Sequence, residues 1–94
     1  MTRVVFNITV NYQSQNLNLT AQLIFKNATA ERYKVSGKNR SITLQNNRPA
    51  LMTMNSEKGI TWKLIEGQMP NGDLMYEIIK SLESKLMTLE KNTD

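Results

Sequence analysis

The chain has 94 residues and a formal net charge of +4, and it contains neither cysteine nor histidine. A chain of this size can bury one small core. The missing cysteine excludes disulfides and thiol-based metal sites, and the missing histidine removes the commonest general base and metal ligand. We therefore expect a single domain over residues 1–94, with strands over about 3–66 and a helix over about 71–91. We expect no catalytic residue, no cofactor and no metal site.

The charges are unevenly distributed along the chain. Residues 1–63 hold nine basic and two acidic residues, whereas residues 64–94 hold three basic and six acidic ones. A basic region attracts nucleic acid or an acidic partner. The competing interpretation is simple solubility, since the sequence has no dense run of Lys and Arg.

No stretch of the sequence approaches the roughly 20 apolar residues that span a bilayer. The first ten residues alternate between apolar and polar side chains, whereas a signal peptide has a continuous apolar run. We therefore expect a complete, cytoplasmic protein without a membrane partner.

Two long strands are predicted at the start of the chain from period-two alternation. Apolar residues occupy alternate positions from Val4 to Tyr12, and again from Leu17 to Phe25. Such alternation places one face of a strand against a core and the other in water. The polar segment 13–16 predicts a hairpin loop between the two strands.

Two shorter strands follow at residues 31–36 and 40–45, where the alternation resumes. Gly37, Lys38 and Asn39 between them predict a tight turn, because Gly and Asn tolerate positive φ. An alternative interpretation is a phosphate-binding loop. That loop would require Ser or Thr directly after Lys38 and a helix after it, so the hairpin turn fits better.

The segment between residues 46 and 67 is predicted to hold two more strands. Pro49 cannot donate to a ladder and is expected to end the preceding strand. Residues 50–54 are predicted as a short fifth strand and residues 60–66 as the last one, which Gly67 closes.

The long helical pattern lies near the C-terminus. Apolar residues recur at helical spacing over residues 71–91 and fall within an arc of roughly 140°, the width of a core-facing stripe. Asn71 is suited to cap this helix, and the helix dipole favours Asp73 in the first turn. Tyr76 and Met87 lie outside the stripe, so we expect both to be exposed.

These elements predict an α+β fold, an antiparallel β-meander of five to six strands with one C-terminal helix packed on one face. The expected core takes alternating strand positions and the helix stripe: Val4, Phe6, Ile8, Val10, Leu19, Leu23, Phe25, Val35, Ile42, Leu44, Trp62, Leu64, Ile78 and Leu82. One helix covers only about three or four strands, so part of the sheet is expected to stay open. A homodimer through the outer face or an edge strand would cover it, and a monomer is the alternative.

Six basic residues are candidate contacts for phosphate or nucleic acid: Arg32, Lys34, Lys38, Arg40, Arg48 and Lys63. Tyr33 and Trp62 could stack on bases. Both occupy positions on the predicted apolar face of their strands, however, which favours packing in the core. No nucleic-acid-binding motif is complete.

The leading functional hypothesis is a small non-catalytic binding or interaction module whose partner is unknown, either another protein or a second copy of the chain. The alternative is a nucleic-acid-associated accessory protein that uses the basic region. No pair of acidic residues lies in an apolar setting, so we do not expect an enzyme.

A longer pattern joins two parts of the chain. It consists of YxVxGKNxSIxLxNNRP from Tyr33 and WKLIEG from Trp62, followed by the C-terminal helix. Over roughly residues 31–90 this pattern resembles a set of short bacterial proteins, common in gut anaerobes, that have no assigned activity. The resemblance implies a bacterial, cytoplasmic, single-domain protein, and it carries over no functional residue.

Overall fold

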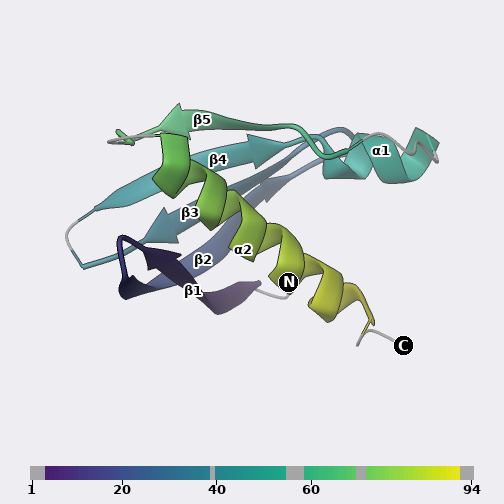
Figure 1. Cartoon of the computed structure of the whole chain (residues 1–94). Coiled ribbons are helices and arrows are strands. Elements are labelled where there is room, and N and C mark those ends of the chain that lie inside the picture. Colours follow the sequence, from purple (N-terminus) through teal and green to yellow (C-terminus); the bar gives the residue numbers. More distant parts are fainter. Residues whose placement is uncertain (1–3, 39, 55–58, 70–71, 92–94) are drawn as a thin grey trace.

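The computed structural model describes residues 4–38, 40–54, 59–69 and 72–91. Its elements are, in chain order, β1 (Val5–Tyr12), β2 (Gln15–Lys26), β3 (Glu31–Ser36), β4 (Ser41–Asn46), α1 (Arg48–Met54), β5 (Trp62–Glu66) and α2 (Gly72–Lys91) (Figure 1).

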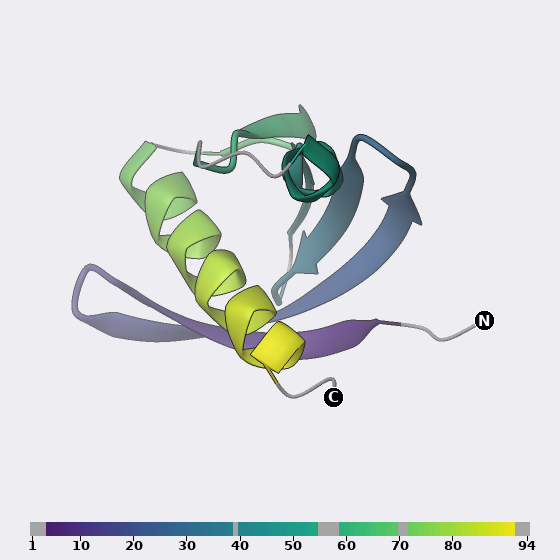
Figure 2. The same cartoon turned by 90° about the vertical axis from the view of Figure 1, so that its right-hand side faces the viewer.

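The five strands form one antiparallel sheet in which each strand pairs with its neighbours in the sequence, in the order β1-β2-β3-β4-β5. The sheet curls around α2, which lies on its concave side (Figure 2). The predicted α+β meander with a C-terminal helix on one face is confirmed. The last strand begins at Trp62, two residues later than the predicted residue 60.

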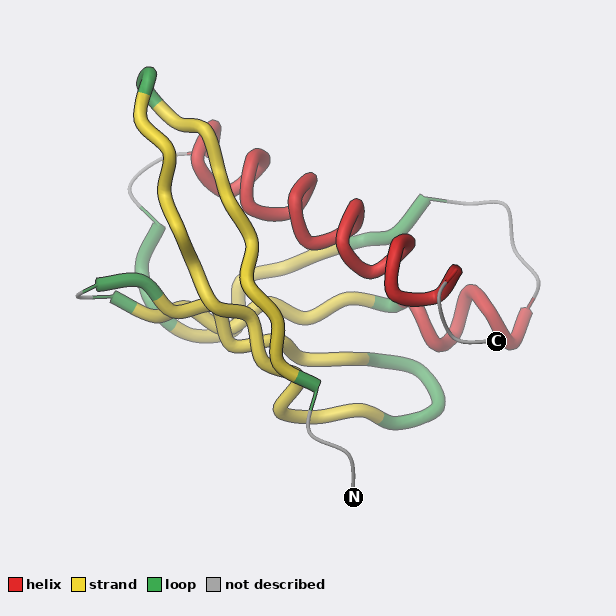
Figure 3. The backbone as a smooth tube through the Cα atoms, turned by 90° about the horizontal axis from the view of Figure 1, so that it is seen from below, coloured by secondary structure: helices red, strands yellow, loops and turns green. Residues whose placement is uncertain are grey.

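A two-residue turn joins β1 and β2, and it is shorter than the predicted loop 13–16. Gln13 and Ser14 both have positive φ, 52° and 61°, and Tyr12 pairs directly with Gln15. Positive φ at both central residues matches the right-handed twist of a hairpin. Figure 3 shows the turn standing clear of the rest of the sheet. Since neither residue is glycine, each left-handed conformation costs about 1–2 kcal/mol.

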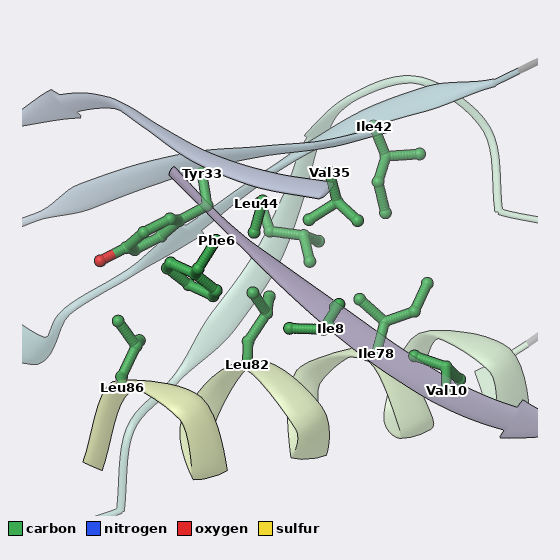
Figure 4. Close-up of a cluster of buried hydrophobic side chains, with 11 residues drawn as sticks. Phe6, Ile8, Val10, Tyr33, Val35, Ile42, Leu44, Ile78, Leu82 and Leu86 are labelled. Atoms are coloured by element: carbon green, nitrogen blue, oxygen red, sulfur yellow. The ribbon is translucent and has the colours of Figure 1, made fainter. Parts of the chain in front are cut away.

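The core lies between the concave face of the sheet and α2. Ile78, Leu82 and Leu86 point from the helix towards the strand side chains (Figure 4). The buried hydrophobic residues are Phe6, Ile8, Val10, Ala21, Tyr33, Val35, Ile42, Leu44, Ile78, Leu82 and Leu86. Of the other predicted core residues, Val4, Leu19, Leu23, Trp62 and Leu64 pack against this cluster while partly exposed.

The prediction that Phe25 lies in the core is wrong. A β-bulge between Leu23 and Phe25 adds one residue, Ile24, to β2 relative to β3. Because side chains alternate along a strand, the extra residue inverts the facing of everything after it. Phe25 therefore pairs with Arg32 on the outer face and is 41% exposed.

The prediction of a strand over residues 50–54 is also wrong, because this segment belongs to the helix α1. The side chain of Asn46 accepts a hydrogen bond from the backbone N–H of Arg48 over 2.8 Å and so caps the first turn. Pro49 lies in that first turn, where its missing N–H costs nothing. The residue that was expected only to end a strand therefore also helps to start a helix.

The C-terminal helix agrees with its predicted extent. The candidate cap Asn71 and the turn residue Asn39 lie outside the described residues. Tyr76 and Met87 are exposed on α2, as predicted.

Candidate functional site

The outer, convex face of the sheet carries a row of paired residues that runs from β2 to β5: Phe25, Arg32, Gln45 and Lys63. The guanidinium of Arg32 lies 5.0 Å from the centroid of the Phe25 ring, and its Nε donates to Oε1 of Gln45 over 2.8 Å. The hydrogen bond and the ring contact hold this charge at a defined place on the face.

Apolar side chains lie beside this row, and the bulge adds Phe25 to them. Val5 and Ile24 are each 48% exposed, and Phe25 adjoins them. Val5 pairs with Gln22, so Ile24 lies diagonally across from it on the same face. Gln22 pairs in turn with Lys34 of β3. We call Val5, Ile24, Phe25, Arg32 and Lys34 the outer patch.

The six candidate phosphate contacts do not form one cluster. Arg32, Lys34 and Lys63 share the outer face, because they have the same parity in paired strands. Lys38 and Arg40 lie at the β3–β4 turn, which a hydrogen bond of 2.8 Å from the Gly37 N–H to the Arg40 carbonyl closes. The hairpin interpretation of this turn is confirmed, since a strand and not a helix follows it. Arg48 lies in α1, apart from both groups.

Arg48 belongs to a buried polar cluster that sequence reasoning missed. Its Nε and Nη2 donate to the two carboxylate oxygens of Glu31 over 2.9 and 3.0 Å, a bidentate ion pair. Glu31 is only 1% exposed. Lys26 approaches the same carboxylate to 3.9 Å but is itself exposed. The alternation along β3 could have revealed the burial of Glu31, because Glu31 occupies the same face of the strand as Tyr33 and Val35.

The hydroxyl of Tyr33 joins this cluster. Burial and, next, the charge of Glu31 raise the pKa of Tyr33 to about 12. The hydrogen bond to Glu31 likewise raises the pKa of Arg48. At neutral pH Tyr33 therefore stays protonated and Arg48 stays charged, so neither is suited to act as a base. The cluster instead ties α1 to β3.

Asn46 lies beside this cluster, opposite Glu31 on the neighbouring strand. Its Oδ1 caps α1, while its Nδ2 is buried and finds no hydrogen-bond partner within the described part of the chain. One amide group thus fixes the start of α1 at the expense of an unsatisfied donor.

The free edge of β1 is partly covered by α2. The Ser81 hydroxyl donates to the carbonyl of Thr9 over 3.3 Å. Tyr12 and Gln15 form a hydrogen-bonded pair across the two-residue turn. Along β1 the backbone groups of every second residue, counted back from Tyr12, therefore bond to β2, whereas the N–H and C=O of Thr9 point away from β2. The helix therefore occupies the middle of this edge and obstructs the approach of another strand.

A separate apolar pocket of about 160 Å³ lies near the start of α2, beneath the tip of the β1–β2 hairpin. Within residues 4–38, 40–54, 59–69 and 72–91, no group of three or more His, Cys, Asp or Glu side chains could hold a metal ion. No helix in the same ranges has both the length and the apolar character needed to cross a membrane.

A scan against protein-family models found no matching family, and searches of curated proteins and of solved structures found no match.

Proposed function

We propose that this protein is a small, non-catalytic binding module that engages an acidic protein partner through the outer patch. The observation that supports this best is the bulge at Ile24, which turns Phe25 outward beside the exposed Ile24 and Val5 and next to two cations. Contiguous exposed apolar surface with a basic rim is typical of interaction sites. Aromatic residues and Arg are also the side chains enriched at interfaces.

The charges of the outer face favour an acidic partner over a second copy of the chain. Arg32, Lys34 and Lys63 lie on this face, whereas Glu66 is the one acidic residue that pairs into it among the described strands. Two copies packed through this face would bring like charges together, which costs binding energy. The other predicted route, pairing through an edge strand, is obstructed at β1 by the Ser81 contact. The predicted homodimer stays a prediction that light scattering tests, since a mass near 10.8 kDa would exclude it.

Nucleic acid is the second candidate partner. An exposed aromatic ring beside cations, as at Phe25 and Arg32, is how many proteins hold single-stranded nucleic acid. Lys34 and Lys63 could add phosphate contacts on the same face. Such binding would weaken steeply with salt.

The experiment compares capture by three immobilised proteins: wild type, Phe25→Ala, and Tyr76→Ala as the matched control. Tyr76 is an exposed aromatic residue on α2, outside the outer patch. We expect one or more acidic proteins to be retained by wild type and Tyr76→Ala, lost with Phe25→Ala and released by added salt. Retention that disappears after nuclease treatment would support the nucleic-acid alternative. Identical retention by all three proteins would overturn the role of the outer patch.

Our proposal also places the module in the bacterial cytoplasm. This part is supported by the sequence resemblance, which implies a bacterial, cytoplasmic protein. Fractionation of a bacterium that carries the gene tests it directly.

A further inference from the structure

The side of α2 that faces away from the sheet carries two large apolar side chains that the core does not use. Tyr76 is 62% exposed and Met87 is 59% exposed, more than any other large hydrophobic residue that the structure describes. In Figure 1 α2 lies in front of the sheet, and no other element covers its outer side. Scattered exposed apolar residues are ordinary, so the arrangement of these two decides what they can do.

Two charged residues, Lys80 and Glu83, lie between these apolar side chains. The four residues are spaced four, three and four positions apart. At about 100° per residue, they fall within an arc of about 60° on the helix surface. Spacing that alternates between three and four is that of the contact positions in a two-helix coiled coil. We call Tyr76, Lys80, Glu83 and Met87 the α2 seam, because this spacing suits a contact with one other helix.

The order of residues along the α2 seam is self-complementary in one orientation. In an antiparallel pair of copies, with a two-fold axis at the middle of the seam, Tyr76 meets Met87 of the other copy. In the same register Lys80 meets Glu83 of the other copy. Sulfur–aromatic contacts and opposite charges both favour association, and the symmetry forms each contact twice. A parallel pair would instead bring the two copies of Lys80 together and the two copies of Glu83 together.

Both charged groups of the seam are available for such a contact. Lys80 is exposed and makes no ion pair with any residue of the described ranges. The Oε1 atom of Glu83 accepts a hydrogen bond of 3.0 Å from the indole Nε1 of Trp62, which holds the carboxylate in place. Its Oε2 atom has no hydrogen-bond or ion-pair partner in that part of the chain, so it can accept from a lysine of another copy.

We propose that the α2 seam joins two copies of the chain in an antiparallel homodimer. The seam spans about 16 Å of helix, and a contact of that length buries less than the roughly 1,200 Å² of a standard interface. We therefore expect a weak dimer, with a dissociation constant of about 0.1 mM. This contact uses neither an edge strand nor the outer patch, so the inference stands independently of the proposed partner.

Sedimentation equilibrium between about 0.02 and 1 mM protein covers the expected dissociation constant. The mass should rise with concentration from near 10.8 kDa towards twice that value. Lys80→Glu and Glu83→Lys should each weaken the dimer at least about tenfold, because each variant sets like charges opposite one another twice. An equal mixture of the two variants should associate again, since every charged pair in the mixed dimer is then of opposite sign.

Two further variants test the apolar contact. Tyr76→Ala should weaken the dimer about fivefold or more, because both Tyr–Met contacts are lost. Phe25→Ala is the matched control, since it truncates an exposed aromatic residue on the convex face, and it should leave the dimer unchanged. Lys80→Glu and Tyr76→Ala alter exposed side chains, so the test does not depend on Glu83→Lys, which also removes the acceptor of the Trp62 indole.

The proposal fails if the wild type keeps a mass near 10.8 kDa at about 1 mM. It also fails if the mixture of Lys80→Glu and Glu83→Lys associates no more than either variant alone. Weakening by Phe25→Ala and not by Tyr76→Ala would place the contact between copies on the convex face instead, and would likewise overturn the proposal.

Discussion

Replacing Arg48 with Met tests whether the buried ion pair holds α1 to the sheet. The variant leaves the carboxylate of Glu31, 1% exposed, with Lys26 at 3.9 Å as its remaining ion-pair partner. Lys26 is itself 57% exposed, and an exposed pair contributes only about 0–1 kcal/mol. Removing one partner of a buried pair costs about 3–5 kcal/mol.

That loss is large compared with the 5–15 kcal/mol of a whole small protein. With about 4–8 °C of melting temperature per kcal/mol in a chain of this size, Arg48→Met should melt at least about 12 °C lower. The double variant Glu31→Leu/Arg48→Met should recover at least about 2 kcal/mol of this loss, because it removes the stranded charge. It should not recover everything, since the Tyr33 hydroxyl then loses both partners.

Urea unfolding followed through the fluorescence of Trp62, the single tryptophan, measures all of these stabilities. Arg40→Met is the matched control, because it removes an exposed arginine and should change stability by less than about 0.5 kcal/mol. A loss below about 1 kcal/mol in Arg48→Met would refute the reasoning. So would a double variant as unstable as the sum of its single variants.

Four further outcomes follow from particular positions. Between about pH 10 and pH 12, the free energy of unfolding of the wild type should fall by about 1.4 kcal/mol per pH unit relative to Tyr33→Phe. The reason is that the unfolded chain releases the Tyr33 proton near pH 10, whereas the folded chain releases it only near the raised pKa of about 12. Urea unfolding at pH 9, 10 and 11 measures the difference. Ser14→Gly should add about 0.5–1 kcal/mol, since it relieves a φ of 61°, and calorimetry would show the rise in melting temperature. Gly67→Ala should cost about 2–4 kcal/mol in the same assay, because φ is 92° and the new Cβ would lie 2.7 Å from the Ser41 carbonyl oxygen. Leu82→Ala should cost about 2–5 kcal/mol, because Leu82 is 0% exposed, and an unchanged melting temperature would contradict the central place of α2.

The predictable parts of the fold are the elements whose sequence pattern is long and fits only one kind of secondary structure. Eight residues of β1 and the whole of α2 repeat their periods often enough to define a buried face. The seven residues of α1 make fewer than two full turns. Over that length Pro49 is as compatible with a strand end as with a first helical turn, and the Asn46 cap decides between them.

The candidate site was predictable to a smaller extent. Parity alone places Arg32 and Lys34 on one face of β3, and the structure confirms that placement. The pairing of Arg48 with Glu31 joins residues 17 positions apart. It depends on both the β3–β4 register and the direction of α1, so alternation within one strand could not reveal it.

The alternation of apolar and polar residues could not predict the bulge at Ile24. The contacts that the bulge makes and loses show what it contributes to stability. An unbroken strand would pair Ile24 with Arg32 and turn Phe25 inward opposite Glu31, while Lys26 faced water. Full burial of a Phe is worth about 1.5–3 kcal/mol, so leaving Phe25 41% exposed gives up part of that. In return, Lys26 comes opposite Glu31 and Arg32 lies over the Phe25 ring. Both gains involve exposed groups and are each about 1 kcal/mol or less, so they offset only part of the loss. An exposed aromatic residue that folding alone does not fully compensate is what a binding surface requires, and this is why we assign the outer patch to a partner.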